Sequence, residues 1–62
     1  MDERILTIPQ VASYLQLSKS KVYSMVSRGE IPHVKFGKSV RVRETGLKEW
    51  MDRQAANPAF AQ

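Results

Sequence analysis

The chain has 62 residues, a formal net charge of +4 and no cysteine. A chain of this length forms one small domain, which buries only about 60% of the surface of its unfolded form and has little room for an enclosed catalytic cavity. Since neither a disulfide nor a thiolate zinc site is available, apolar packing alone must stabilise the fold. No apolar run approaches the roughly 20 residues of a membrane span, and the acidic start of the chain is unlike a signal peptide. We therefore expect a soluble, cytoplasmic protein.

The positive charge is concentrated between residues 18 and 43. This segment has seven lysines and arginines against one carboxylate, Glu30, so its net charge is +6, whereas the rest of the chain sums to −2. A segregated positive field favours a polyanionic partner, most often nucleic acid. The seven cationic residues are Lys19, Lys21, Arg28, Lys35, Lys38, Arg41 and Arg43.

The first predicted element is a helix over residues 8–15. Thr7 is a side-chain cap and Pro9 lies in the first turn, as at many helix starts. The apolar residues recur at three- and four-residue spacing and predict one buried stripe, which consists of Ile8, Val11, Ala12 and Leu15. Residues 16–18 are long enough only for a tight turn, and Ser18 is a suitable cap for a second helix.

A second helix is predicted over residues 19–28, ended by Gly29 in the left-handed conformation. Its buried stripe is predicted to contain Val22, Met25 and Val26, and its outward face is polar and basic. Tyr23 lies beside the buried stripe, and we expect its ring to pack there and its hydroxyl to face outward.

From residue 33 to residue 43 the apolar residues alternate with polar ones, which predicts two antiparallel strands. Matching the apolar faces requires Phe36 opposite Val40 and Val34 opposite Val42, with a three-residue loop over residues 37–39. In this predicted register Lys35 lies opposite Arg41, and His33 lies near Arg43. Like charges in such positions destabilise an isolated hairpin, and a phosphate backbone between them would remove the penalty.

A third helix is predicted from about Glu44, with Leu47, Trp50 and Met51 facing the core and Arg53 near its end. Residues 54–62, which include Phe60, show no periodicity and are predicted to be a flexible tail. The predicted organisation is thus a short extension over residues 1–5, a domain over residues 6–53 and the tail.

Two helices joined by a tight turn, followed by a basic hairpin and a closing helix, have the arrangement of a winged helix-turn-helix domain, a mostly α fold with a small β-hairpin. The run LTIPQVASYLQLS (residues 6–18) resembles the opening motif of excisionase-family DNA-binding domains, small relatives of the MerR-type regulators. The likeness continues through VY (22–23), GEIP (29–32), FGKSVRV (36–42) and LKEWM (47–51). It covers residues 6–53 without a gap.

Four positions depart from this family pattern. Gln16 stands where many relatives have glycine, and the substitution costs roughly 1 kcal/mol if the position requires a positive φ. Lys21 and Ser24 replace residues that relatives often carry on the recognition surface, so a base preference cannot be transferred to this chain. Gly46 replaces an aspartate or similar residue and weakens the start of the last helix.

The resemblance and the charge pattern together imply binding to double-stranded DNA. The second helix would enter the major groove, and the basic hairpin, or wing, would lie along an adjacent minor groove. The predicted contacts from the recognition helix are Ser18, Lys19, Ser20, Lys21, Tyr23, Ser24 and Arg28. Those from the wing are Lys35, Gly37, Lys38, Arg41 and Arg43.

The residue types do not favour an enzyme. There is no cysteine nucleophile, no glycine-rich phosphate loop and only a single histidine, His33, so we expect no catalytic site, metal or cofactor. The favoured function is that of an excisionase-like recombination directionality factor, which bends attachment-site DNA, assists an integrase, binds cooperatively and resides at the bacterial nucleoid. One alternative is a small transcriptional regulator of a phage, plasmid or mobile element. Another is a protein-docking adaptor that uses the tail around Phe60 and the acidic last helix.

Overall fold

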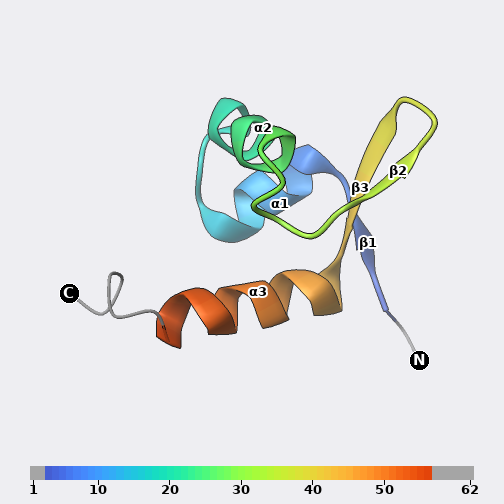
Figure 1. The fold of residues 1–62 in the computed structure, drawn as a ribbon. Helices are drawn as coiled ribbons and strands as arrows, with labels where there is room; N and C mark the ends of the chain where they lie inside the picture. Colours follow the sequence, from blue (N-terminus) through green and yellow to red (C-terminus); the bar gives the residue numbers. More distant parts are fainter. Residues whose placement is uncertain (1–2, 57–62) are drawn as a thin grey trace.

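The computed structural model describes residues 3–56, which form three helices and a small antiparallel sheet (Figure 1). The elements follow the order β1 (Ile5–Leu6), α1 (Ile8–Leu15), α2 (Lys19–Ser27), β2 (Val34–Phe36), β3 (Ser39–Arg43) and α3 (Glu44–Ala56). The predicted winged helix-turn-helix fold is confirmed. No helix in this described part of the chain is both long enough and apolar enough to cross a membrane.

Helix α1 begins and ends where the sequence predicted, and local hydrogen bonds fix both ends. The Thr7 hydroxyl accepts a bond from the backbone N–H of Gln10 (3.3 Å), and the Gln10 side chain accepts one from the backbone N–H of Thr7 (2.9 Å). This reciprocal capping box satisfies donors that have no partner inside the helix. At the other end Gln16 adopts the left-handed conformation with φ 58°, so the position does require the positive φ that glycine would meet without strain.

Helix α2 ends at Ser27, one residue earlier than predicted. The Ser18 hydroxyl caps its start by accepting a bond from the backbone N–H of Lys21 (3.1 Å). Arg28 is the C-cap, with φ −84° and ψ 0°, and Gly29 then turns the chain with φ +74°, as predicted. Because caps hold both of its ends, α2 is a short, rigid element that needs only three residues to connect to α1.

The core is small and entirely apolar among the described residues. Leu6 comes from β1, Val42 from β3 and Leu47 from α3, while Ile31 lies in the connection before the wing. The other members come from α1 and α2, and they are Ile8, Val11, Ala12, Val22, Met25 and Val26. Leu15, Val40 and Trp50 pack against this cluster as partly buried residues.

The prediction that Met51 lies in the core is wrong, because its exposed fraction is 37%. Trp50, three residues after Leu47, packs against the core instead. Met51 lies about 100° from Trp50 round the helix and on the other side of Leu47, at the edge of the buried stripe, where more than a third of its surface reaches solvent. Helix α3 also continues through Ala56, so residues 54–56 belong to the helix and not to the predicted tail. The rest of that tail, with Phe60, lies outside the described residues.

The sheet has three strands in the order β1-β3-β2, so β3 is central. Strand β1 pairs antiparallel with β3, with Ile5 opposite Arg43 and Leu6 opposite Val42. Strand β1 was not predicted, because a two-residue strand is too short to show any periodicity.

The predicted register of the wing is wrong by one residue. Strand β2 pairs with β3 so that Val34 lies opposite Arg41, Lys35 opposite Val40, and Phe36 opposite Ser39. The loop therefore has two residues, with Gly37 at φ +63°, as a type II′ turn with glycine in its first central position requires.

The physical reason for the error is that the core reaches only one of the two strands. Val42 is buried and Val40 is half-buried, whereas all three residues of β2 are exposed, so no shared apolar face constrains the register. Residues directly opposite each other share a face of the sheet. Lys35 and Arg41 consequently lie on opposite faces of the wing, and the predicted crowding of like charges does not occur.

Replacing Gln16 with glycine should stabilise the domain. A non-glycine residue at φ 58° is strained, and glycine removes that strain at some cost in chain entropy. We expect Gln16→Gly to raise the free energy of unfolding by about 0.5–1 kcal/mol. Urea denaturation followed by circular dichroism measures the change. Ser13→Gly, at an exposed position inside α1, is the control and should lower stability by about 0.5 kcal/mol.

Candidate nucleic-acid interface

Helix α2 presents every predicted contact residue on its exposed surface. Val22, Met25 and Val26 turn inward, so the remaining positions face solvent. The exposed set is Ser18, Lys19, Ser20, Lys21, Tyr23, Ser24 and Arg28. Within residues 3–56 neither Lys19 nor Lys21 forms an ion pair, so the first turn of α2 offers two cations to a partner.

Tyr23 is more exposed than the sequence predicted. Its exposed fraction is 55%, so its ring does not pack substantially beside the buried stripe. The side chain instead adds an aromatic ring and a hydroxyl to the outer face of α2. Such a group can contact a base edge, a sugar or a phosphate.

Arg28 is held by neighbours on its own segment. Its Nε donates to Oε2 of Glu30 (2.7 Å), and its Nη1 donates to the Ser24 hydroxyl (2.7 Å). The hydrogen bond and the opposite charge raise the pKa of Arg28 and lower that of Glu30. Arg28 and Ser24 are therefore partly engaged at the C-terminal end of α2, unlike the lysines of its first turn.

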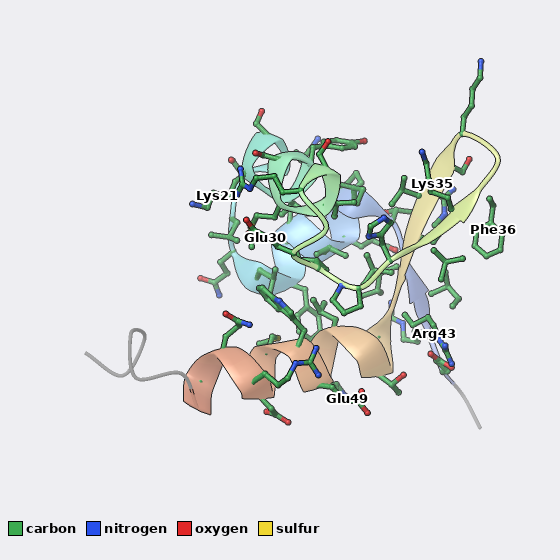
Figure 2. All side chains as sticks on the ribbon, viewed as in Figure 1. Lys21, Glu30, Lys35, Phe36, Arg43 and Glu49 are labelled. Atoms are coloured by element: carbon green, nitrogen blue, oxygen red, sulfur yellow. The ribbon has the colours of Figure 1, made fainter. Side chains whose placement is uncertain are left out.

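The wing exposes Lys35, Gly37 and Lys38, while Arg41 is half-buried. Figure 2 shows Lys35 and Phe36 extending from opposite sides of the hairpin, as their adjacent positions in β2 require. The Nη1 atom of Arg41 donates to the backbone carbonyl of Val40 (2.8 Å), which holds the guanidinium close to the strand. Two exposed lysines and one constrained arginine thus provide the positive charge of the wing.

Arg43 has a carboxylate partner that the sequence analysis missed. Its Nε donates to Oε2 of Glu3 (2.6 Å) and its Nη2 to Oε1 of the same residue (3.3 Å). The Thr45 hydroxyl also donates to Glu3 Oε2 (2.9 Å), and the backbone N–H of Glu44 donates to the carbonyl of Arg4 (2.9 Å). This cluster fastens the N-terminal segment to the base of the wing. Arg43 is therefore a structural residue there and not a free cation.

The positive segment divides into two groups of cations. Of its seven lysines and arginines, Arg28 and Arg43 are paired with carboxylates in the described structure. The other five belong to the first turn of α2 or to the wing, and they are Lys19, Lys21, Lys35, Lys38 and Arg41. Figure 1 shows α3 starting at the end of β3 that is away from the wing tip.

The remaining side chains show no arrangement for holding a metal ion. Within residues 3–56 no three histidine, aspartate or glutamate side chains lie close enough to share one. His33 lies in an open hollow of about 300 Å³ at the base of the wing, together with Arg43 and Glu49. Its Nδ1 is 2.9 Å from the carbonyl of Ile31, so in the tautomer that donates this bond the ring is anchored to its own backbone.

The model of the helix-turn-helix domain family matches residues 5–55 of the chain. The chain belongs to this family. Helix-turn-helix domains bind duplex DNA through their second helix, which here is α2. The family assignment thus supports a DNA-binding unit and gives no indication of an enzymatic activity.

Curated relatives agree with this assignment. A Mycobacterium tuberculosis protein named "Putative DNA-binding protein" is 35% identical over 49 residues, which are 79% of this chain and 63% of that protein. A Saccharopolyspora erythraea protein named "Probable excisionase" is 32% identical over 57 residues, which are 92% of this chain and 58% of that protein. A Bacillus subtilis protein, YvgK, is 39% identical over 44 residues, but the match covers only 14% of its length. No solved structure matches the chain.

These relatives confirm the excisionase resemblance that the sequence motifs predicted, while the relation to MerR-type regulators stays a prediction. The chain spans 63% of the mycobacterial protein and 58% of the excisionase. The family assignment therefore supports DNA binding by this domain, and it does not extend to the parts of the relatives that the chain does not cover.

The contact between Glu3 and Arg43 should make stability depend on pH. The hydrogen bond from Arg43, and then that from Thr45, holds the pKa of Glu3 below its usual 4.5. The folded protein consequently binds this proton less tightly than the unfolded chain. The contact stabilises the fold above about pH 4.5, and this stabilisation disappears as the pH falls through the lowered pKa.

Glu3→Gln should therefore flatten the pH dependence of the unfolding midpoint as the pH falls below about 4.5. Thermal unfolding in a pH series measures this slope. Arg43→Gln removes the same ion pair from its other side and should flatten the slope similarly. A Glu3→Gln slope equal to that of the wild type would contradict the assignment.

Proposed function

We propose that the domain binds double-stranded DNA with the first turn of α2 in the major groove and the wing against the adjacent minor groove. The supporting observation is the placement of cations that pair with no carboxylate within residues 3–56, with Lys19 and Lys21 at the start of α2 and Lys35 and Lys38 on the wing. A major groove about 12 Å wide admits one helix, and the N-terminal residues of that helix lie nearest the base edges.

The two elements would have different roles. Lys21 can donate to guanine O6 and N7, whereas Ser18 and Ser20 suit phosphates or either type of base pair. Lys38 at the turn and Arg41 on β3 would contact phosphates irrespective of sequence. Arg28 and Arg43 would have to exchange a carboxylate for a phosphate, so we expect smaller contributions from them.

We further propose that the protein is an excisionase-like recombination directionality factor, which bends attachment-site DNA and assists an integrase. The relative named as an excisionase supports this role, since its match covers 92% of the chain. Such a role implies a location at the nucleoid, contact with the integrase and cooperative binding of several copies. A transcriptional regulator of a mobile element would need the same groove contacts, and the relative named only as DNA-binding supports this alternative.

Substitutions should distinguish base recognition by α2 from phosphate binding by the wing. Lys38→Ala and Arg41→Ala should weaken binding to all duplexes alike. The plot of log affinity against log salt should also become less steep, by about 0.9 for each phosphate that the variant no longer neutralises. Lys21→Ala should instead change the preference among sequences, by about 1–3 kcal/mol at the base pair it contacts. Fluorescence anisotropy with a panel of duplexes at two salt concentrations measures both effects.

The matched control is Lys48→Ala, which removes an exposed cation from α3, outside both the first turn of α2 and the wing. It should change affinity for all duplexes by less than twofold. Identical behaviour of the Lys21, Lys38 and Arg41 variants would show that the proposed division of roles is wrong. Affinity that does not fall as salt rises would count against phosphate contacts altogether.

The recombination role has its own test. The protein is combined with a candidate integrase and a plasmid that carries the attachment sites of that integrase, and excision products are counted with and without the protein. We expect excision to depend on the protein and a circular-permutation assay to show bent attachment DNA. Unchanged excision together with unbent DNA would support the regulator instead.

A further inference from the structure

We propose that Phe36 is an apolar wedge that enters the minor groove at the tip of the wing and bends the duplex. The inference rests on the proposed binding of DNA and adds a role for a side chain that the charge pattern does not explain. Phe36 has the highest exposed fraction among the large apolar residues described, 59%. It immediately precedes the two-residue turn of the wing.

Folding gives no reason for a phenylalanine at this position. All three residues of β2 are exposed, and Phe36 lies opposite Ser39, so the residue across the strand pair is polar. Figure 2 shows its ring extending away from the side of the hairpin that carries Lys35. A side chain of this size that contributes so little to the core is free to contact a partner.

The surroundings of Phe36 become more positive toward the turn. Lys38 lies in the turn, and Arg41 lies on the same face of the sheet because it is opposite Val34. At the other end of this face Arg43 is neutralised by Glu3, close to the exposed Ile5. The half of the face nearest the tip therefore combines an aromatic ring with cations that no described carboxylate neutralises, which suits an anionic partner with apolar surface.

The minor groove has that chemistry, since phosphates border a floor of sugars and base edges. A protein with an acidic apolar patch would also suit the face. We favour DNA because the proposed phosphate contacts of Lys38 and Arg41 already bring the tip to the duplex. Phe36 shares a face of the sheet with Arg41 and stands two residues before Lys38.

The dimensions of the groove imply deformation. Two paired strands are about 4.8 Å apart before their side chains are counted, and the undistorted minor groove is only about 6 Å wide. The tip of the wing can therefore enter only if the groove widens. Apolar side chains that insert at a base step partly unstack it and bend the duplex away from the minor groove, which opens the groove in this way.

The test compares binding and bending for one duplex. The wild-type protein is first used to select a tightly bound duplex of about 30 base pairs from a random pool. Affinity is then measured by anisotropy, the bend by energy transfer between dyes at the two ends, and unstacking by 2-aminopurine fluorescence at each step in the wing-proximal groove. Phe36→Ala should weaken binding roughly tenfold, reduce the bend by at least half and abolish the 2-aminopurine signal.

Two sets of control variants give the result its meaning. Phe36→Leu and Phe36→Trp keep an apolar wedge and should retain most of the bend. The affinity of Phe36→Ala should depend on salt as that of the wild type does, because the variant still neutralises the same phosphates. Ile5→Ala and Val34→Ala remove exposed apolar residues from the same face further from the tip, and should leave the bend unchanged. Thermal unfolding of Phe36→Ala should match that of the wild type.

Specific results would overturn the proposal. If Phe36→Ala binds and bends the duplex as the wild type does, Phe36 is not a wedge. If it keeps single-site binding and bending but no longer supports cooperative binding of a second copy, the face docks protein instead. If the wild-type protein binds no duplex at either salt concentration, the proposed function fails and this inference fails with it.

Discussion

Strand β3 is the element on which the rest of the domain depends. It pairs with both other strands, packs against α1 and α3, and places Val42 in the core with no exposed surface. The wing projects from one end of this strand, and α3 starts directly after the other. Val42 belongs to the same buried cluster as residues of α1 and α2, so β3 connects the wing to the core on which both helices pack.

The extent to which the sequence predicts this fold follows from the range of the interactions. Thr7, Ser18 and Gly29 act within three or four residues, so the bounds of α1 and α2 were predictable to within one residue. The wing register was not, because the prediction required β2 and β3 to share a core that reaches only β3. The contact between Glu3 and Arg43 joins residues 40 positions apart, and a charge pattern along the chain gives no sign of it.

The candidate interface was predictable in composition but not in its division of roles. Every residue expected on α2 is exposed, since helical periodicity alone determines which side chains face outward. Pairing with carboxylates then distinguishes Arg28 and Arg43 from the other five cations of the positive segment. The unpaired positive charge of this segment is thus concentrated at the first turn of α2 and on the wing, the two elements that we propose contact a duplex.

The register of the wing has a further functional consequence. In the predicted register Phe36 would share a face with Val40 and Val42 and would belong to the core side, leaving a wing whose outer face is only basic. In the observed register it shares a face with Ser39 and Arg41 and is exposed. A type II′ turn in place of a three-residue loop therefore transfers an aromatic ring from the core side to the outer face. Because Gly37 makes this turn possible, the glycine determines that Phe36 is exposed and so available for the proposed contact with DNA.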